Sequence, residues 1–233
     1  MRQIPAQQLL DCWEAFRDQP RPLRAVALVA LLMGQPLQEV LSWSVVRRDV
    51  GLFDLQAQVF GNNIEAVTHC PQCAEKLEMQ LDLAQIKPKA SALKKNNTRT
   101  LKVNGHSVRY RAPTSEDLLA IASLHDVGEA RAQLLARCIQ TTQPELRELA
   151  AARVAARIAD EQADVQLNLT CPACGHGWQS IFDIASFVWH ELDAWAQRTL
   201  REVHLIASAY GWGEDEILQL SARRRQTYIE MIR

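Results

Sequence analysis

The sequence lacks a hydrophobic run long enough to cross a membrane. Its longest apolar run, residues 25–33, has nine residues, whereas a transmembrane helix needs about 20. We therefore expect this run to form a buried helix, and we expect no membrane partner. The segment before it contains acidic side chains and prolines and does not resemble the short basic start of a secretory signal peptide. These features indicate a cytoplasmic protein.

An excess of charge of one sign is also absent. The chain has 26 lysines and arginines against 27 aspartates and glutamates. A nearly neutral protein exerts no long-range attraction on nucleic acid or on an anionic membrane surface. The composition therefore does not favour a nucleic-acid-binding function.

Common catalytic motifs are missing as well. His190-Glu191 begins a zinc-protease-like pattern, but Ala194 stands where the second histidine is required. The sequence contains no glycine-rich phosphate-binding loop and no nucleophile elbow. We therefore expect the protein not to be an enzyme, and we assign no catalytic residue.

The most informative feature present is a pair of Cys-Pro-x-Cys motifs. Six cysteines in a reducing cytoplasm do not indicate a disulfide framework, and four of them lie in residues 70–73 and 171–174. Alternating apolar residues at 64–69 and 165–169 predict a strand before each motif. Zinc takes four ligands in tetrahedral geometry, and closed sites of four cysteines are structural. The sequence thus predicts one structural zinc ion, bound by Cys70, Cys73, Cys171 and Cys174.

The two motif regions repeat one plan. Each has a small residue after the second cysteine, a large apolar residue four positions past it, and an aspartate nine positions past it (Ala74, Leu77 and Asp82; Gly175, Trp178 and Asp183). The motifs are separated by 97 residues, 74–170. Loop-closure entropy grows only logarithmically with length, so this separation does not forbid a shared site. The residues between the motifs are then an insertion in a zinc ribbon.

Two alternatives remain open for the cysteine motifs. A redox motif would place its first cysteine at a helix N-terminus, where the thiol pKa is lowered, but both motifs adjoin predicted strands. His69 or His176, beside the motifs, is the alternative ligand in place of a cysteine. The remaining cysteines, Cys12 and Cys138, lie in predicted helices, and we expect them to be small core residues.

We expect a mostly helical α+β fold. The apolar spacing predicts helices across 6–60, with the fourth starting near Arg48, and a strand over 77–83 after the first motif. A basic linker is predicted at 87–98, and Asn104-Gly105 predicts a type I′ hairpin turn. The predicted organisation comprises an N-terminal helical region (1–62), a split zinc ribbon (63–86 and 163–184), an insertion with linker, β-hairpin and helices (87–162), and C-terminal helices (185–233).

Within this organisation, Thr114 or Ser115 is expected to cap a helix, and further helices are expected over 129–139 and 145–159. A long helix should run from about Ile184 to Tyr210 and end at a break around Trp212.

Beyond that break the pattern predicts two short helices, which are marginal alone. We hypothesise that this tail contributes to partner recognition, and the candidate contacts are Trp212, Arg223, Arg224, Arg225 and Tyr228. Docking of the tail on the chain's own long helix is the alternative.

Several stretches resemble a known family. They are LTCPACGHGWQSIFDIASFVWHELDAWAQRTLREVHLIASAYGWGEDEILQLSARRRQTYIEMI, FGNNIEAVTHCPQCAEKLEMQLDLAQI and, more loosely, RYRAPTSEDLLAIA. Over roughly residues 45–232 the chain is similar to the T4-family baseplate hub assembly chaperones of contractile phages and extracellular contractile injection systems. The resemblance implies a non-enzymatic chaperone or scaffold whose partners are hub or spike proteins of a contractile tail.

The alternative function is a zinc-ribbon nucleic-acid-binding or transcription accessory protein. Such a protein needs a basic face on the ribbon to contact phosphates. The first predicted hairpin instead carries Glu65, Glu78 and Asp82, with Lys76 in its turn. The charge of the ribbon therefore favours the assembly function.

Overall fold

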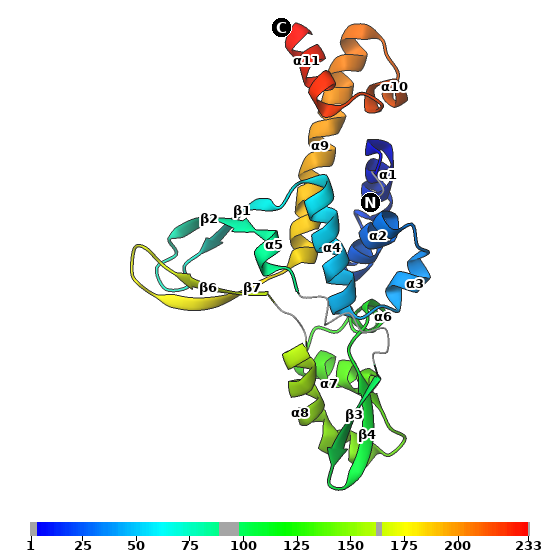
Figure 1. Cartoon of the computed structure of the whole chain (residues 1–233), viewed down its shortest axis with the longest axis vertical. Helices are drawn as coiled ribbons and strands as arrows, with labels where there is room; N and C mark the ends of the chain where they lie inside the picture. The colour runs from blue at the N-terminus through cyan, green and yellow to red at the C-terminus, as the bar shows by residue number, and fades with distance from the viewer. Residues whose placement is uncertain (1–3, 89–97, 162–164, 233) are drawn as a thin grey trace.

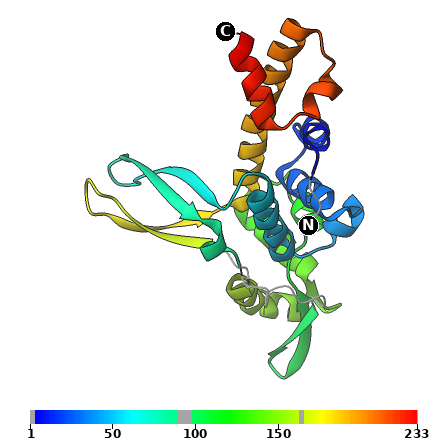
Figure 2. The same ribbon diagram turned by 45° about the horizontal axis from the view of Figure 1, so that its top comes forward.

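The computed structural model describes residues 4–88, 98–161 and 165–232. A central group of helices carries a β-hairpin region at one end and the chain's last helices at the other (Figure 1). Two further hairpins project together from one side, and the rotated view in Figure 2 shows the same projection. The predicted fold class, a mostly helical α+β protein with small antiparallel hairpins, is confirmed.

The central helices enclose the larger of two hydrophobic cores. Residues 25–30, in the apolar run, are all buried, so the predicted buried helix is confirmed. Among the described residues no helix has the length and hydropathy needed to cross a membrane. The main helices of this core are α1 (Ala6–Phe16), α2 (Arg21–Met33), α3 (Leu37–Leu41), α4 (Val45–Val59) and α9 (Ile184–Tyr210).

Helix α4 begins earlier than the sequence predicted. We expected it to start near Arg48, but Ser44 caps it by accepting a hydrogen bond from the amide of Arg47 at 3.3 Å. Gly51 lies inside the helix, where glycine is unfavourable. A Cβ atom at Gly51 would lie 3.0 Å from Cγ1 of Val29 in α2. The glycine is therefore required by the close approach of α2 and α4.

We expect Gly51→Ala to lower the free energy of unfolding by about 1 kcal/mol. The added methyl group overpacks the core against Val29, which is fully buried, and this cost exceeds the helix-propensity gain. Urea denaturation measures the change. In a Val29→Ala background the clash is removed, so the same substitution should stabilise the chain. Destabilisation by Gly51→Ala in both backgrounds would contradict this explanation.

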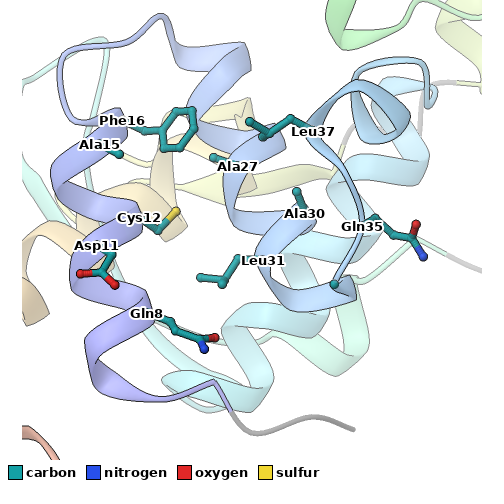
Figure 3. A pocket seen from close by; sticks show the side chains of 11 residues that line it. Gln8, Asp11, Cys12, Ala15, Phe16, Ala27, Ala30, Leu31, Gln35 and Leu37 are labelled. Carbon is teal, nitrogen blue, oxygen red and sulfur yellow. The ribbon is translucent and has the colours of Figure 1, made fainter.

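A cavity of about 450 Å³ lies between α1, α2 and the start of α3. Figure 3 shows that Cys12 projects from α1 toward α2, whose residues Ala27 and Ala30 also line the cavity. Burial, aided by the charge of Asp11, raises the pKa of the Cys12 thiol to about 11. The thiol is therefore protonated at neutral pH, and Cys12 is a core residue, as predicted.

The residues between the cysteine motifs form a second, smaller core. It contains Val103, Val108, Tyr110, Cys138 and the buried face of α8. Cys138 is fully buried and its pKa is raised to about 11, chiefly by burial, so it too is a core residue, as predicted. The elements of this region are β3 (Thr98–Val103), β4 (His106–Arg111), α6 (Ser115–Ala120), α7 (Val127–Cys138), β5 (Ile139–Gln140) and α8 (Pro144–Glu161).

The hairpin of this region has the turn that its sequence predicted. Asn104 and Gly105 have φ angles of 48° and 83°, as a type I′ turn requires. The sequence did not predict β5, because Ile139 was assigned to the end of a helix. In the structure Ile139 pairs with Tyr110 of β4 and adds a third strand. Residues 89–97 of the predicted basic linker lie outside the described residues.

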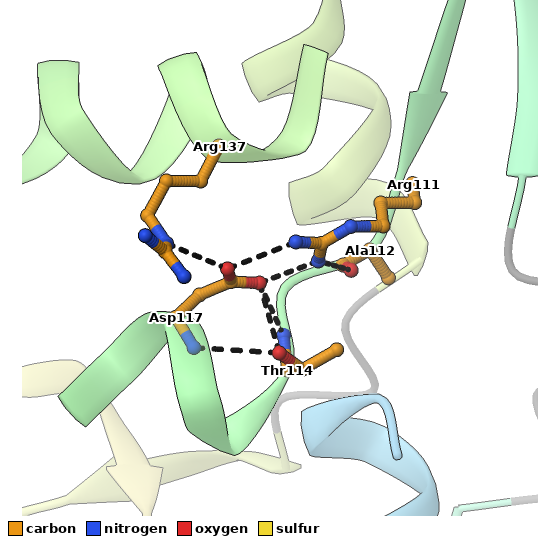
Figure 4. Close-up of polar contacts among 5 residues, drawn as sticks. All are labelled: Arg111, Ala112, Thr114, Asp117 and Arg137. Atoms are coloured by element: carbon orange, nitrogen blue, oxygen red, sulfur yellow. Dashed lines mark hydrogen bonds and ion pairs between the residues drawn. The ribbon is translucent and has the colours of Figure 1, made fainter. Parts of the chain in front are cut away.

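A buried carboxylate links three elements of this region, β4, α6 and α7. Both carboxylate oxygens of Asp117 are bonded to the guanidinium of Arg111, and Nε of Arg137 donates to one of them at 2.8 Å. Thr114 donates its amide (2.9 Å) and its hydroxyl (3.0 Å) to the same side chain (Figure 4). The hydroxyl of Thr114 also accepts a hydrogen bond from the amide of Asp117 at 3.3 Å, so Thr114 caps α6, as predicted, in a reciprocal capping box.

The charge of Asp117 is strongly stabilised. Its side chain is 1% exposed, and burial alone would raise its pKa. The hydrogen bonds from Arg111, Thr114 and Arg137 outweigh burial and hold the pKa of Asp117 well below its usual range. Asp117 thus joins β4, α6 and α7 through one ionised group.

A separate contact anchors α6 to the central helices. Arg48 of α4 is buried and donates from Nη1 to the hydroxyl of Ser115 at 3.1 Å. Asp49 balances its charge, with Nη2 of Arg48 at 2.6 Å from the carboxylate. Next to it, the amide of Val45 donates to the carbonyl of Pro113 at 3.0 Å.

Candidate metal centre

Each cysteine motif lies at the tip of one projecting hairpin. The strands pair antiparallel, β1 (Asn63–His69) with β2 (Lys76–Asp82) and β6 (Val165–Thr170) with β7 (Gly177–Phe182). In the first tip the amide of Cys70 donates to the carbonyl of Glu75, and the amide of Ala74 donates to the carbonyl of Cys70, both at 2.9 Å. These bonds close a tight turn around the cysteine pair.

The second tip repeats the first, bond for bond. The amide of Cys171 donates to the carbonyl of His176, and the amide of Gly175 donates to the carbonyl of Cys171, again at 2.9 Å. Gly175 has a φ of 73°, and Ala74 at the equivalent position has a φ of 60°. A non-glycine residue rarely adopts this conformation, so the strained alanine shows how firmly the turn is imposed at both tips.

The four sulfur atoms converge where the tips meet. Sγ of Cys70 lies 3.7 Å from Sγ of Cys174, and Sγ of Cys73 lies 3.6 Å from Sγ of Cys171. All four sulfurs lie within 4.8 Å of one another. A tetrahedron with metal–sulfur bonds of 2.3 Å has edges of about 3.8 Å. The spacing therefore fits one metal ion coordinated by all four side chains.

The backbone of the first tip favours a thiolate. Burial would raise the pKa of Cys70, but the amides of Cys73 and Gln72, which donate to its sulfur, lower it to about 7. At Cys73 the amide of Glu75 also acts to lower the pKa. The neighbouring thiols, Cys174 first among them, and burial have the larger effect together, and they raise the pKa of Cys73 to about 12. Four sulfurs this close cannot all be ionised unless a cation balances their charge.

The histidines beside the tips do not belong to the cluster of four sulfurs. His69 is exposed at the end of β1. The ring of His176 stacks on that of Trp178, with centroids 6.1 Å apart and an interplanar angle of 12°. The geometry therefore assembles four sulfur ligands without a histidine, and both motifs join strands rather than helix N-termini.

A comparison with known families supports one assignment. The family described as T4 bacteriophage base plate protein matches residues 48–189. The chain belongs to this baseplate family. Membership implies baseplate partners in general. No curated protein and no solved structure matches the chain.

The baseplate-family match contains all four cysteines, both projecting hairpins and the insertion between them. It begins in α4 and ends within the first turns of α9. The four-cysteine cluster is thus part of the region that defines the family match, whereas α10 and α11 lie outside it.

Two aspartates in the repeat have a function that the sequence did not specify. Asp82 caps α5 (Leu83–Ile86) by accepting a hydrogen bond from the amide of Ala84 at 2.9 Å. Asp183 caps α9 in the same way, with the amide of Ala185 at 3.0 Å. The residue after each aspartate, Leu83 or Ile184, is buried in the larger core. Each repeat therefore ends in a helix cap that fixes its hairpin to the body.

The tail predicted to recognise a partner packs on its own chain. Helices α10 (Glu214–Leu218) and α11 (Ala222–Ile232) contact α9, with Ile217 and Leu218 buried. The ring of Trp212 stacks on that of Tyr210, at a centroid distance of 5.2 Å, and meets Tyr228 edge-on at 5.0 Å. In this structure Trp212 and Tyr228 therefore pack against each other and against Tyr210 of α9, as the self-docking alternative expected.

The three consecutive arginines of the tail differ in their surroundings. Arg225 is 4% exposed, and its Nε donates to Glu202 of α9 at 2.7 Å. Its Nη1 also donates to the carbonyl of Leu220 at 2.8 Å. Arg225 therefore stabilises the packing of the tail on α9, and its contact with a partner stays a prediction. Arg223 and Arg224 are exposed, and their contact with a partner stays a prediction.

Proposed function

We propose that this protein is a non-enzymatic assembly chaperone or scaffold for the hub or spike of a contractile-tail baseplate, and that its four-cysteine cluster holds one structural zinc ion. The convergence of four sulfurs inside the region matched to the baseplate family carries this proposal. The resemblance of residues 45–232 to hub assembly chaperones supports the more specific role.

The ligand set supports zinc in a structural role. Cys70, Cys73, Cys171 and Cys174 supply soft thiolate ligands, which favour zinc over magnesium or calcium. Four protein ligands fill a tetrahedral zinc site and leave no position for substrate or water. The ion would stabilise the fold by linking the β1–β2 hairpin, which ends at Asp82, to the β6–β7 hairpin, which starts at Val165.

The hairpins need such a tie. A two-stranded hairpin is at best marginally stable alone in water. Both sheets have only two strands each, and their side chains alternate between exposed and half-buried, with only Ile64 buried. A metal at the tips and the helix caps at the bases would together hold the hairpins in a fixed direction.

The charges of the projecting hairpins do not favour a nucleic-acid partner. Glu65 is exposed on β1. Lys76 is engaged by Glu78, with Nζ 2.5 Å from the carboxylate. Phosphate binding requires uncompensated lysines and arginines, so a protein partner agrees better with this surface.

The assembly function predicts a defect in tail assembly when the gene is deleted from its phage or injection-system cluster. Sheath and tube proteins should still be made, but electron micrographs should show few complete baseplates, because the hub is not assembled. Purified wild-type chain should contain one zinc per molecule by elemental analysis. A tagged chain should co-purify with hub or spike proteins from assembling cells.

Mass spectrometry of finished particles separates the two forms of the proposal. A chaperone should be bound to hub intermediates and absent from mature tails, whereas a scaffold component should remain. Normal baseplates in the deletion strain would overturn the assembly role. A production strain lacking only the sheath gene provides the control, since it should still yield hub complexes.

A further inference from the structure

Helix α7 leaves most of its surface uncovered. Of its 12 residues only Cys138 is buried. Helices of this length are marginal in water unless an amphipathic face packs against something. The first residue of α7, Val127, is 81% exposed. The helix therefore offers an unpartnered face next to the smaller core.

That face borders a groove shared with α8. The groove has a volume of about 400 Å³. Its lining on α7 falls at one helical face, positions 128, 131, 132, 135 and 136, and its lining on α8 falls at positions 144, 147, 148 and 151. Both sets follow the i, i+3, i+4, i+7 spacing of a helix-packing surface. The α7 wall is about 12 Å long at 1.5 Å per residue, enough for two turns of a third helix.

The charged side chains that line the groove are more basic than acidic. Arg131 is exposed and forms no ion pair within residues 98–161 or the other described segments. Arg147 donates from Nη2 to the carbonyl of Thr141 at 2.7 Å, but its Nε is shielded from water and has no acceptor among the described residues. Glu148 is the lining acid. Two cations against one anion favour an acidic partner.

We propose that the groove between α7 and α8 docks an amphipathic helix of a partner protein, with apolar side chains against Ala132, Leu135 and Ala151 and an acidic side chain beside Arg131 and Arg147. An apolar groove with charged rims is a recurring mode of helix recognition. The assignment of this helix to a hub or spike protein rests on the proposed function, whereas the groove and its preference for acid do not.

Two designed peptides test the proposal. Both are lactam-stapled 18-residue helices with one leucine stripe, and they differ only in having glutamates or lysines beside the stripe. Fluorescence anisotropy with the full-length protein should show that the acidic peptide binds about threefold to fivefold more tightly, as expected for an exposed ion pair. Arg131→Glu should reverse this preference. Ala136→Trp should fill the groove and abolish binding of both peptides.

Gln133→Trp is the matched control, because Gln133 is exposed on α7 but does not line the groove. This variant should bind like the wild type. Equal binding of the two peptides, insensitivity to Ala136→Trp, or no saturable binding at millimolar peptide would overturn the proposal. A self-associated protein that Ala136→Trp converts to a monomer, seen by sedimentation velocity, would instead assign the groove to a second copy. None of these results depends on zinc content or tail assembly, so each leaves the proposed function standing.

Discussion

Cys171→Ser is expected to remove the metal from the protein and to unfold both projecting hairpins. Cys171 is 1% exposed and lies 3.6 Å, sulfur to sulfur, from Cys73 of the other hairpin. Structural zinc contributes apparent binding free energy on the order of 10 kcal/mol, and a two-stranded sheet is at best marginally stable alone. Elemental analysis should find almost no zinc, and limited proteolysis should cut within residues 63–82 and 165–182.

A double variant makes this test decisive. Cys70→Ser with Cys171→Ser removes one ligand from each hairpin, so a shared site must lose its ion completely. Cys12→Ala and Cys138→Ala are the controls, because both thiols are core residues far along the chain from the motifs. Full zinc retention in the double variant would contradict a shared site.

Asp117→Asn is expected to lower the free energy of unfolding by about 3 kcal/mol, because it removes the negative partner from a largely buried ionic network and weakens a helix cap. The full cost of breaking a buried pair is discounted here, since the side chains of Arg111 and Arg137 are 24% and 43% exposed. Urea denaturation followed by circular dichroism measures the change. Glu116→Gln, on the same helix, is a matched control and should be nearly neutral.

The effect of Asp117 should depend on pH in one direction. Its folded-state pKa lies below its unfolded value, near 3.9, so its contribution is present above that value and is lost as pH falls through the folded pKa. The stability difference between wild type and Asp117→Asn should therefore be constant above about pH 5 and should shrink in more acidic solution. A difference that persists unchanged at pH 2 would assign the effect to shape rather than charge.

The local features of the fold could be predicted because their causes are local. The turn at Asn104 and Gly105, the cap at Thr114 and the two cysteine motifs each depend on a few neighbouring residues. The alternating strands and the helical spacing of the core could also be identified along the chain. Even the pairing of the distant motifs was accessible, because zinc requires four ligands and each motif supplies two.

The features that sequence analysis missed join residues through space. Nothing adjacent to Asp117 shows that Arg137, 20 positions later, shares its carboxylate. The burial of Arg225 depends on Glu202, 23 positions earlier on another helix. The short pairing of Ile139 with Tyr110 has too few residues to show a period. These contacts depend on how the helices and strands are placed relative to one another. The spacing of residues along one element does not predict that placement.

The separation of the two cysteine motifs also determines when, during translation, the four-cysteine site can form. The first cysteine pair is made before the second, and 97 residues must be added between them. At 5 to 20 residues per second this delay lasts about 5 to 20 s. During that time Cys70 and Cys73 are present without Cys171 and Cys174, while the inserted region can form its own core. A site that needs all four cysteines can therefore form only after Cys174 has been made, so a nascent chain halted earlier cannot complete it.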